Sequence, residues 1–204
     1  MTPEDRRRRH KAAAAAHDRF NAAAVTPIMV VLALCLALPS PDGAKAANSA
    51  LTWLILAYTC ADLLYIVLAP HCQVGPMRWS TILLHHVVTL WLICHPILYP
   101  RHRHLVVQVA IVEVNTFVRI LQRLTRWPLL EPAFMATWVT MRLVWCPYLV
   151  YSFHREALAQ GFRRWGYTYC QTVGSQAVLC CLNLFWSGEF AMSLSRRRHK
   201  LAAS

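Results

Sequence analysis

Residues Ser80–Pro96 read STILLHHVVTLWLICHP, an apolar run that carries two adjacent histidines, His85 and His86. An apolar run close to the length of a bilayer crossing predicts a membrane-spanning helix. A buried imidazole without a polar partner costs free energy, so both histidines are expected to face the interior of a helical bundle. Neighbouring side chains on a helix point about 100° apart, so His85 shares a face with Thr89 while His86 faces an adjacent helix. Either one imidazole lines a cavity that the other helps to organise, or the pair only joins helices.

The composition of the whole chain is that of a polytopic membrane protein. Of its 204 residues, 57% are hydrophobic and 15% are charged, which is too apolar for an ordinary soluble domain. The formal net charge is +12, but Lys and Arg gather at the chain ends and between apolar runs, as membrane anchors do. Nucleic-acid binding is therefore rejected. The eight cysteines form no CxxC pair, so we expect no metal site, no disulfide framework and no bound cofactor.

Six apolar segments follow a basic N-terminal tail, residues 1–19. Each is near the roughly 20 residues that cross a bilayer, and prolines and glycines separate them. We predict an all-α fold, a bundle of six transmembrane helices with a polar interior cavity over residues 20–192, followed by a second basic tail, residues 193–204. The spans are expected at about Phe20–Leu38, Ser49–Ala69, Ser80–Tyr99, Leu105–Leu124, Ala133–Phe153 and Cys170–Met192.

The distribution of basic residues predicts the orientation of the bundle. Of the 21 Lys and Arg residues, 13 lie outside the spans on the side that holds both termini, 6 lie on the opposite side, and Arg119 and Arg142 lie within spans. By the positive-inside rule, both termini and their tails are expected in the cytosol. The first span also has features of a cleavable signal peptide, because a short apolar run follows arginines and precedes small residues.

The fourth span has an unusually polar face. Such a face cannot contact lipid, so it is expected to look toward protein or a wet cavity. Glu113 and Arg119 lie on opposite sides of this helix and cannot pair, so Glu113 is expected to meet a histidine of the pair or Arg142. An ion network that only holds helices together is the alternative. The polar residues of this span are Gln108, Glu113, Asn115, Thr116, Arg119 and Gln122.

Four blocks of sequence carry a family resemblance: ILLHHVVTLWLI, VEVNTFVRILQRL, MRLVWCPYLVY and LNLFWSGEF. Their order, from a His pair through Glu-x-Asn-Thr to Asn-x-x-Trp, resembles the TLC domain. Ceramide synthases, translocon-associated membrane proteins and several lipid-regulating proteins share this domain. The resemblance covers roughly Ser49–Met192. It implies a multi-pass protein of the endoplasmic reticulum that handles membrane lipids, and it favours a retained first span.

The resemblance also implies a chemistry. In ceramide synthases the matching His pair is associated with acyl transfer from acyl-CoA to a sphingoid amine, a reaction that suits imidazole. By this resemblance, His85 and His86 would be catalytic, Glu113 would assist them, and acyl-CoA would be a co-substrate. Six further polar residues in the spans would bind the substrate: Asp62, Thr89, Asn115, Thr116, Arg119 and Arg142.

Downstream of the His pair, the chain departs from the synthases. Their acidic block has a His-Asp followed by Asp and a later Leu-Glu, whereas only Glu113 stands at a comparable place here. This pattern is closer to the non-synthase branch, whose members are linked to membrane lipid composition. We therefore expect a protein that handles lipid and regulates membrane lipid composition, with acyl-CoA-dependent lipid N-acyl transfer as the alternative. A homodimer or a lipid-enzyme partner is compatible with both. A di-iron hydroxylase is rejected, because the histidines are too few to supply its ligands.

Overall fold

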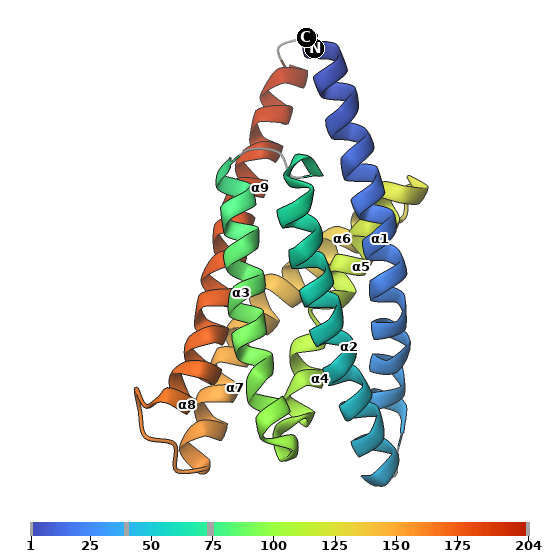
Figure 1. Cartoon of the computed structure of the whole chain (residues 1–204). Coiled ribbons are helices and arrows are strands. Elements are labelled where there is room, and N and C mark those ends of the chain that lie inside the picture. The colour runs from blue at the N-terminus through green and yellow to red at the C-terminus, as the bar shows by residue number, and fades with distance from the viewer. Residues whose placement is uncertain (1, 39–40, 73–75, 203–204) are drawn as a thin grey trace.

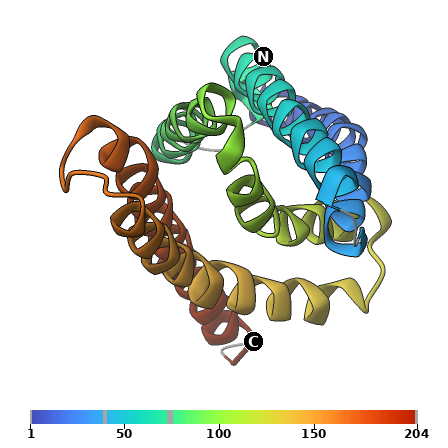
Figure 2. The ribbon, with the colours of Figure 1, turned by 90° about the horizontal axis from the view of Figure 1, so that it is seen from below.

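The computed structural model describes residues 2–38, 41–72 and 76–202, and over these ranges the chain is helical and contains no strand. Long helices run side by side along one axis (Figure 1). Seen along that axis, they are arranged in a ring (Figure 2). Both ends of the chain lie at the same end of the bundle (Figure 1). The expected all-α, polytopic fold is confirmed.

The first helix is longer than its span. Helix α1 covers Pro3–Ala37, and its first turn is closed by a capping box in which Thr2 and Asp5 bond to each other's backbone N–H. The predicted solvated tail is wrong in its last turn, because His17 and Asp18 are buried. The reason is that both side chains have partners on other helices, as described below. Helix α1 packs against α2, which covers Pro41–Leu68.

The third and fourth spans run in opposite directions and are joined by a short turn. Helix α3 covers Pro76–Leu98, after the short η1 (Pro70–Cys72), and η2 (Pro100–His102) turns the chain. The fourth predicted span consists of two helices, α4 (His104–Ala110) and α5 (Glu113–Thr125), with a tighter turn between them. Helix α5 ends at Arg126, whose left-handed φ of 55° terminates the helix ahead of Pro128.

The fifth span is one continuous helix whose middle turns are π-helical. Helix α6 (Leu130–Thr137) passes into the π-helical η3 (Trp138–Trp145) and then into α7 (Cys146–Ala159). Pro147 has no N–H and its ring crowds the carbonyl one turn earlier. The backbone accommodates it with wider turns, in which the N–H of Cys146 bonds to the carbonyl of Met141.

The sixth predicted span is the least apolar of the six. It comprises α8 (Tyr167–Tyr169), the π-helical η4 (Cys170–Gly174) and α9 (Ser175–Ala202), and α9 packs against α3 and α7. Polar residues Gln176, Asn183 and Glu189 interrupt it, and it is not among the helices that are long and apolar enough to cross a membrane. Within the described residues, five helices meet that condition: Glu4–Ala37, Gly43–Leu68, Met77–Leu98, His104–Thr125 and Leu130–Ala159.

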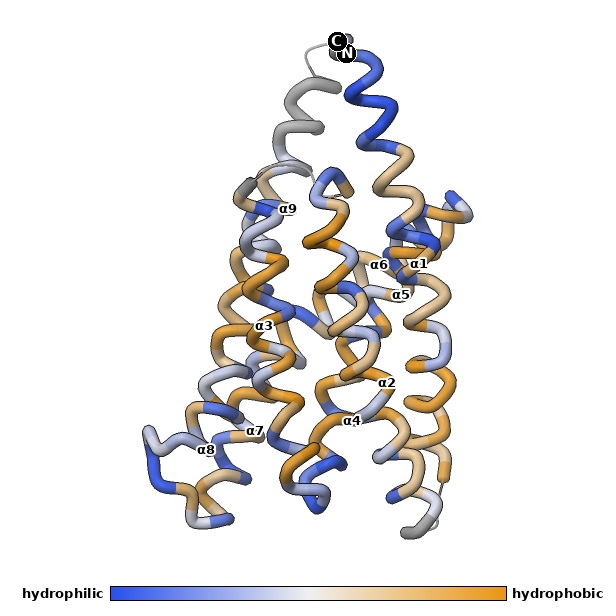
Figure 3. The backbone as a smooth tube through the Cα atoms, in the orientation of Figure 1, coloured by the Kyte–Doolittle hydropathy of each residue, from blue (hydrophilic) through white to orange (hydrophobic). Residues whose placement is uncertain are grey.

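The outer surface of the bundle suits a lipid environment. Hydrophobic residues dominate the middle of the rods, and hydrophilic ones gather toward the two ends (Figure 3). Large apolar side chains point outward at many positions, which in water would be an unfavourable surface. Examples within the spans are Leu36, Leu64, Val87, Val144 and Leu184.

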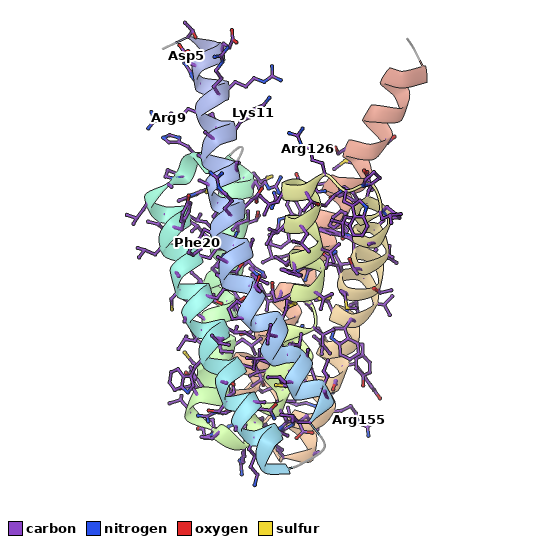
Figure 4. The ribbon with its side chains drawn as sticks, turned by 90° about the vertical axis from the view of Figure 1, so that its right-hand side faces the viewer. Asp5, Arg9, Lys11, Phe20, Arg126 and Arg155 are labelled. Carbon is purple, nitrogen blue, oxygen red and sulfur yellow. The ribbon has the colours of Figure 1, made fainter. Side chains whose placement is uncertain are left out.

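The arrangement predicts which loops share a side of the membrane. Arg9, Lys11 and Arg126 lie toward the end that carries the termini, whereas Arg155 lies toward the other end (Figure 4). A glycosylation acceptor fused to either terminus is expected to remain unmodified in microsomes, while one inserted after Gly161 is expected to be modified. Modification of the fused terminal acceptors, without modification at Gly161, would contradict the predicted cytosolic orientation.

Candidate functional site

A carboxylate between two imidazoles lies in the interior of the bundle. Oδ1 of Asp62, on α2, is 2.6 Å from Nε2 of His17, on α1. Its Oδ2 is 2.8 Å from Nε2 of His86, on α3. All three residues are buried. The network therefore joins three helices through the side chain of Asp62. It also brings together two residues that the sequence indicated as candidate site residues, Asp62 and His86.

The hydrogen-bond partners of His86 leave neither ring nitrogen free. Its Nδ1 is 2.8 Å from the carbonyl oxygen of Ile82, and a carbonyl only accepts, so Nδ1 carries a proton. Its Nε2 shares a second proton with Asp62. Asp62 thus has an imidazole partner on each carboxylate oxygen, and such partners offset the cost of burying its charge. His86 is thus held in place and is not free to react.

His85 is the free member of the pair. Its Nδ1 is buried and has no hydrogen-bond partner among the described residues. Its ring lies 5.5 Å, centroid to centroid, from both His86 and Trp186. Trp186, on α9, donates to Thr81, one turn before His85 on α3. The helical pattern predicted that the two imidazoles would have different surroundings, and they do.

Arg142 organises a second buried network, in which no carboxylate takes part. Its guanidinium donates to Oδ1 of Asn183 at 2.9 Å, to Oγ1 of Thr116 at 2.9 Å and to Oδ1 of Asn115 at 3.4 Å. Asn115 also donates to Thr137 at 3.0 Å. These contacts join α5, the rod of α6 and η3, and α9, so the polar face of the fourth span serves helix packing in part.

The remaining predicted residues are placed differently. Arg119 faces α6, where its guanidinium lies 4.6 Å from the ring centre of Phe134, and it donates to Gln122. Thr89 donates to the carbonyl of His85 at 2.8 Å. Glu113 is half-buried and forms no hydrogen bond or ion pair within the described ranges. Its expected direct pairing with an imidazole or Arg142 is therefore wrong.

Sequence analysis missed two residues of these networks. His17 lies in the stretch that looked like a solvated tail, and the available signal was its spacing of four from Asn21, which places two polar residues on one face just before the apolar run. Asp18 forms an ion pair with Arg123 of α5, at 2.7 Å, so α1 closes the ring between α2 and α5. Asn183, the Asn of the Asn-x-x-Trp block, was not assigned as a partner of Arg142.

The interior is polar around these networks, but a small cavity beside them is lined mainly by apolar side chains. It has a volume of about 30 Å³ and runs from Thr89, one turn beyond His85, toward the end of the bundle opposite the termini. Within the described residues, no cluster of three or more His, Cys, Asp or Glu side chains can hold a metal ion. The arrangement offers imidazole chemistry at His85 beside a hydrocarbon-lined space.

Comparison with known families agrees with this geometry. A family model described as the TLC domain matches residues 28–192. The chain belongs to the TLC-domain family. No curated protein and no solved structure matches it. The match includes Asp62, His85, His86 and Arg142, whereas His17 lies before it. The family assignment makes this a multi-pass membrane protein of a lipid-related family.

The network around Asp62 makes a testable contribution to stability. Asp62→Leu leaves two buried imidazoles without their acceptor, and breaking a buried, hydrogen-bonded charge pair on one side lowers the free energy of unfolding by about 3–5 kcal/mol. Denaturant unfolding in detergent measures this loss. The matched control is Glu4→Ala, which removes an exposed pair with Arg8 and is expected to change stability little. An Asp62→Leu variant as stable as the native protein would show that the network does not contribute to stability.

Proposed function

We propose that this TLC-domain protein transfers acyl groups to a membrane lipid and thereby regulates membrane lipid composition. The observation that carries the proposal is the contrast within the His pair. His86 has both ring nitrogens engaged, whereas His85 has a buried Nδ1 without a partner. A buried ring nitrogen without a hydrogen-bond partner costs folding free energy, so its presence favours a chemical role.

In this proposal His85 acts as a general base. It takes a proton from the amine or hydroxyl of the acceptor lipid while that atom attacks the carbonyl carbon of the acyl thioester. The C–S bond then breaks, and His85 returns the proton to the departing coenzyme A thiolate. General acid–base catalysis of this kind contributes about 10²–10⁴-fold. His86, held between Asp62 and the carbonyl of Ile82, supports the position of its neighbour.

The two parts of acyl-CoA, its polar head and its acyl chain, would lie in different parts of the bundle. The polar head of coenzyme A cannot enter hydrocarbon, so it would stay at the end that carries the termini, which we assign to the cytosol. Arg78, Arg123 and Arg126 are available at that end for its phosphates. Arg123 is already paired with Asp18, so Arg78 and Arg126 are the less committed of the three. The acyl chain would extend toward Thr89 and the apolar cavity.

A second candidate is a lipid-binding regulator without catalytic activity. The observation that favours it is the second network, where Arg142 uses Asn115, Thr116 and Asn183 to join helices instead of leaving them free for a substrate. Residence in the endoplasmic reticulum, and association with a second copy or with a lipid enzyme, are proposals under both candidates.

Purified protein separates the two candidates. With labelled acyl-CoA and a panel of amine and hydroxyl lipids, the native protein is expected to transfer the acyl group. His85→Ala is expected to reduce the rate by about 10²–10⁴-fold. The matched control is His104→Ala, which removes an exposed imidazole and should leave the rate unchanged.

Two outcomes would count against acyl transfer through His85. Full activity in His85→Ala would remove this imidazole from the mechanism. No transfer to any acceptor, by native protein whose folding is verified by its unfolding transition, would favour the regulator.

A further inference from the structure

The connection between α7 and α8, residues 160–166, protrudes sideways at the end of the bundle opposite the termini (Figures 1 and 2). A Schellman motif ends α7, with a left-handed φ of 71° at Gly161. The N–H of Gly161 donates to the carbonyl of Leu158 at 3.0 Å, and the N–H of Phe162 donates to that of Ala157 at 2.9 Å. Defined hydrogen bonds therefore set the direction in which the chain leaves the helix.

Ring contacts on both sides of this connection fix its depth along the bundle. The ring centre of Phe162 lies 6.1 Å from that of His95 and 6.2 Å from that of His102. The ring centre of Tyr167 lies 6.0 Å from that of Trp91, on α3. Trp91 precedes the end of α3 by about 10 Å along the helix axis. The residues between Phe162 and Tyr167 therefore lie beside the last turns of the third span, where hydrocarbon gives way to lipid headgroups.

The tip of the connection is a strained turn. The N–H of Gly166 donates to the carbonyl of Arg163 at 2.9 Å, and Trp165, the third residue of that turn, has a left-handed φ of 65°. Glycine usually takes such a position, because the left-handed conformation is unfavourable for residues with a Cβ. Trp165 is also 84% exposed, more than any other large apolar side chain in the described ranges. A strained turn that presents an exposed indole indicates a contact outside the protein itself.

Two arginines precede the indole in the same turn. Arg163 and Arg164 are exposed, and their side chains form no hydrogen bond or ion pair in the part of the chain that the structure describes. The carboxylate nearest to them in the sequence, Glu156, already accepts from Gln160 at 2.6 Å. Guanidiniums bind phosphates through paired hydrogen bonds, and long Arg side chains reach from the edge of the hydrocarbon to the headgroups. The charge of the turn therefore matches the phosphates of a lipid surface at this depth.

We propose that this turn binds phospholipid in the leaflet opposite the termini, with a preference for anionic headgroups. The indole of Trp165 lies at the boundary between the acyl chains and the headgroups, where Trp is enriched in membrane proteins. Arg163 and Arg164 extend from the same turn to the phosphates, and a net negative headgroup strengthens their attraction. These contacts offset the strain of the turn and hold this end of the bundle at one depth in the bilayer.

Fluorine NMR tests the depth of the indole. The full chain is labelled with fluorotryptophan and placed, one copy per disc, in nanodiscs of phosphatidylcholine. The Trp165 signal is assigned as the one that Trp165→Phe lacks. Three paramagnetic probes are compared: a lipid with a doxyl group near the start of its acyl chain, a lipid with the group at the end of that chain, and a water-soluble gadolinium chelate. We expect the first probe to broaden the Trp165 signal most.

Anionic lipid tests the two arginines. Replacing part of the phosphatidylcholine with phosphatidylserine is expected to shift the Trp165 signal, because the anionic lipid gathers beside the turn. The double variant Arg163→Gln/Arg164→Gln is expected to lose this shift. The matched control is Arg6→Gln/Arg7→Gln, which removes two exposed arginines at the opposite end of the bundle and should keep it. None of these measurements depends on acyl transfer.

Three results would overturn the proposal. Strongest broadening by the gadolinium chelate would place the indole in water. Protection from all three probes would show that protein, and not lipid, covers it. An undiminished shift in an Arg163→Gln/Arg164→Gln protein that keeps the native unfolding transition would remove the arginines from the site. If that variant does not fold, the probe comparison on the native protein decides.

Discussion

A carboxylate shared by two imidazoles is the interaction on which the interior of this bundle depends. Asp62 alone would be an uncompensated charge in an apolar surrounding, which costs several kcal/mol. His17 and His86 remove that penalty, and each comes from a different helix. The pairing therefore fixes the rotation of α1, α2 and α3 about their axes, because each helix has to present one particular face. It also decides which of the two adjacent histidines stays free.

Elsewhere in the interior, buried charged and polar side chains also need hydrogen-bond partners, but the partners are of other kinds. Arg142 is buried and forms no ion pair within the described residues, and three neutral oxygens accept its hydrogen bonds. The π-helical turns of η3 carry this side chain, and widened turns of this kind occur frequently at functional sites. At the far end, Arg101 donates to His102, and His102 shares a hydrogen bond with His95. These buried polar groups thus find their partners within the bundle.

Much of this was accessible from sequence, because hydropathy and helix breakers report directly on what a bilayer tolerates. The spans and the divergent surroundings of His85 and His86 followed from run length and from the 3.6-residue period. His17 was missed because local composition assigns it to a basic tail, and only the position of Asp62 on another helix makes its burial favourable. The partner of Arg142 was misjudged for a related reason: the sequence favours a carboxylate such as Glu113, whereas packing supplied amides and a hydroxyl.

The protonation of the His pair tests the central claim most directly. Nitrogen-15 NMR of histidine-labelled protein in nanodiscs, assigned with His85→Gln and His86→Gln, reports the state of each ring nitrogen. The account predicts that Nδ1 of His86 carries a proton, that its Nε2 signal changes in Asp62→Asn, and that the His85 signals barely respond to that substitution. A His86 whose nitrogens are indifferent to Asp62→Asn, or a His85 that responds instead, would contradict it.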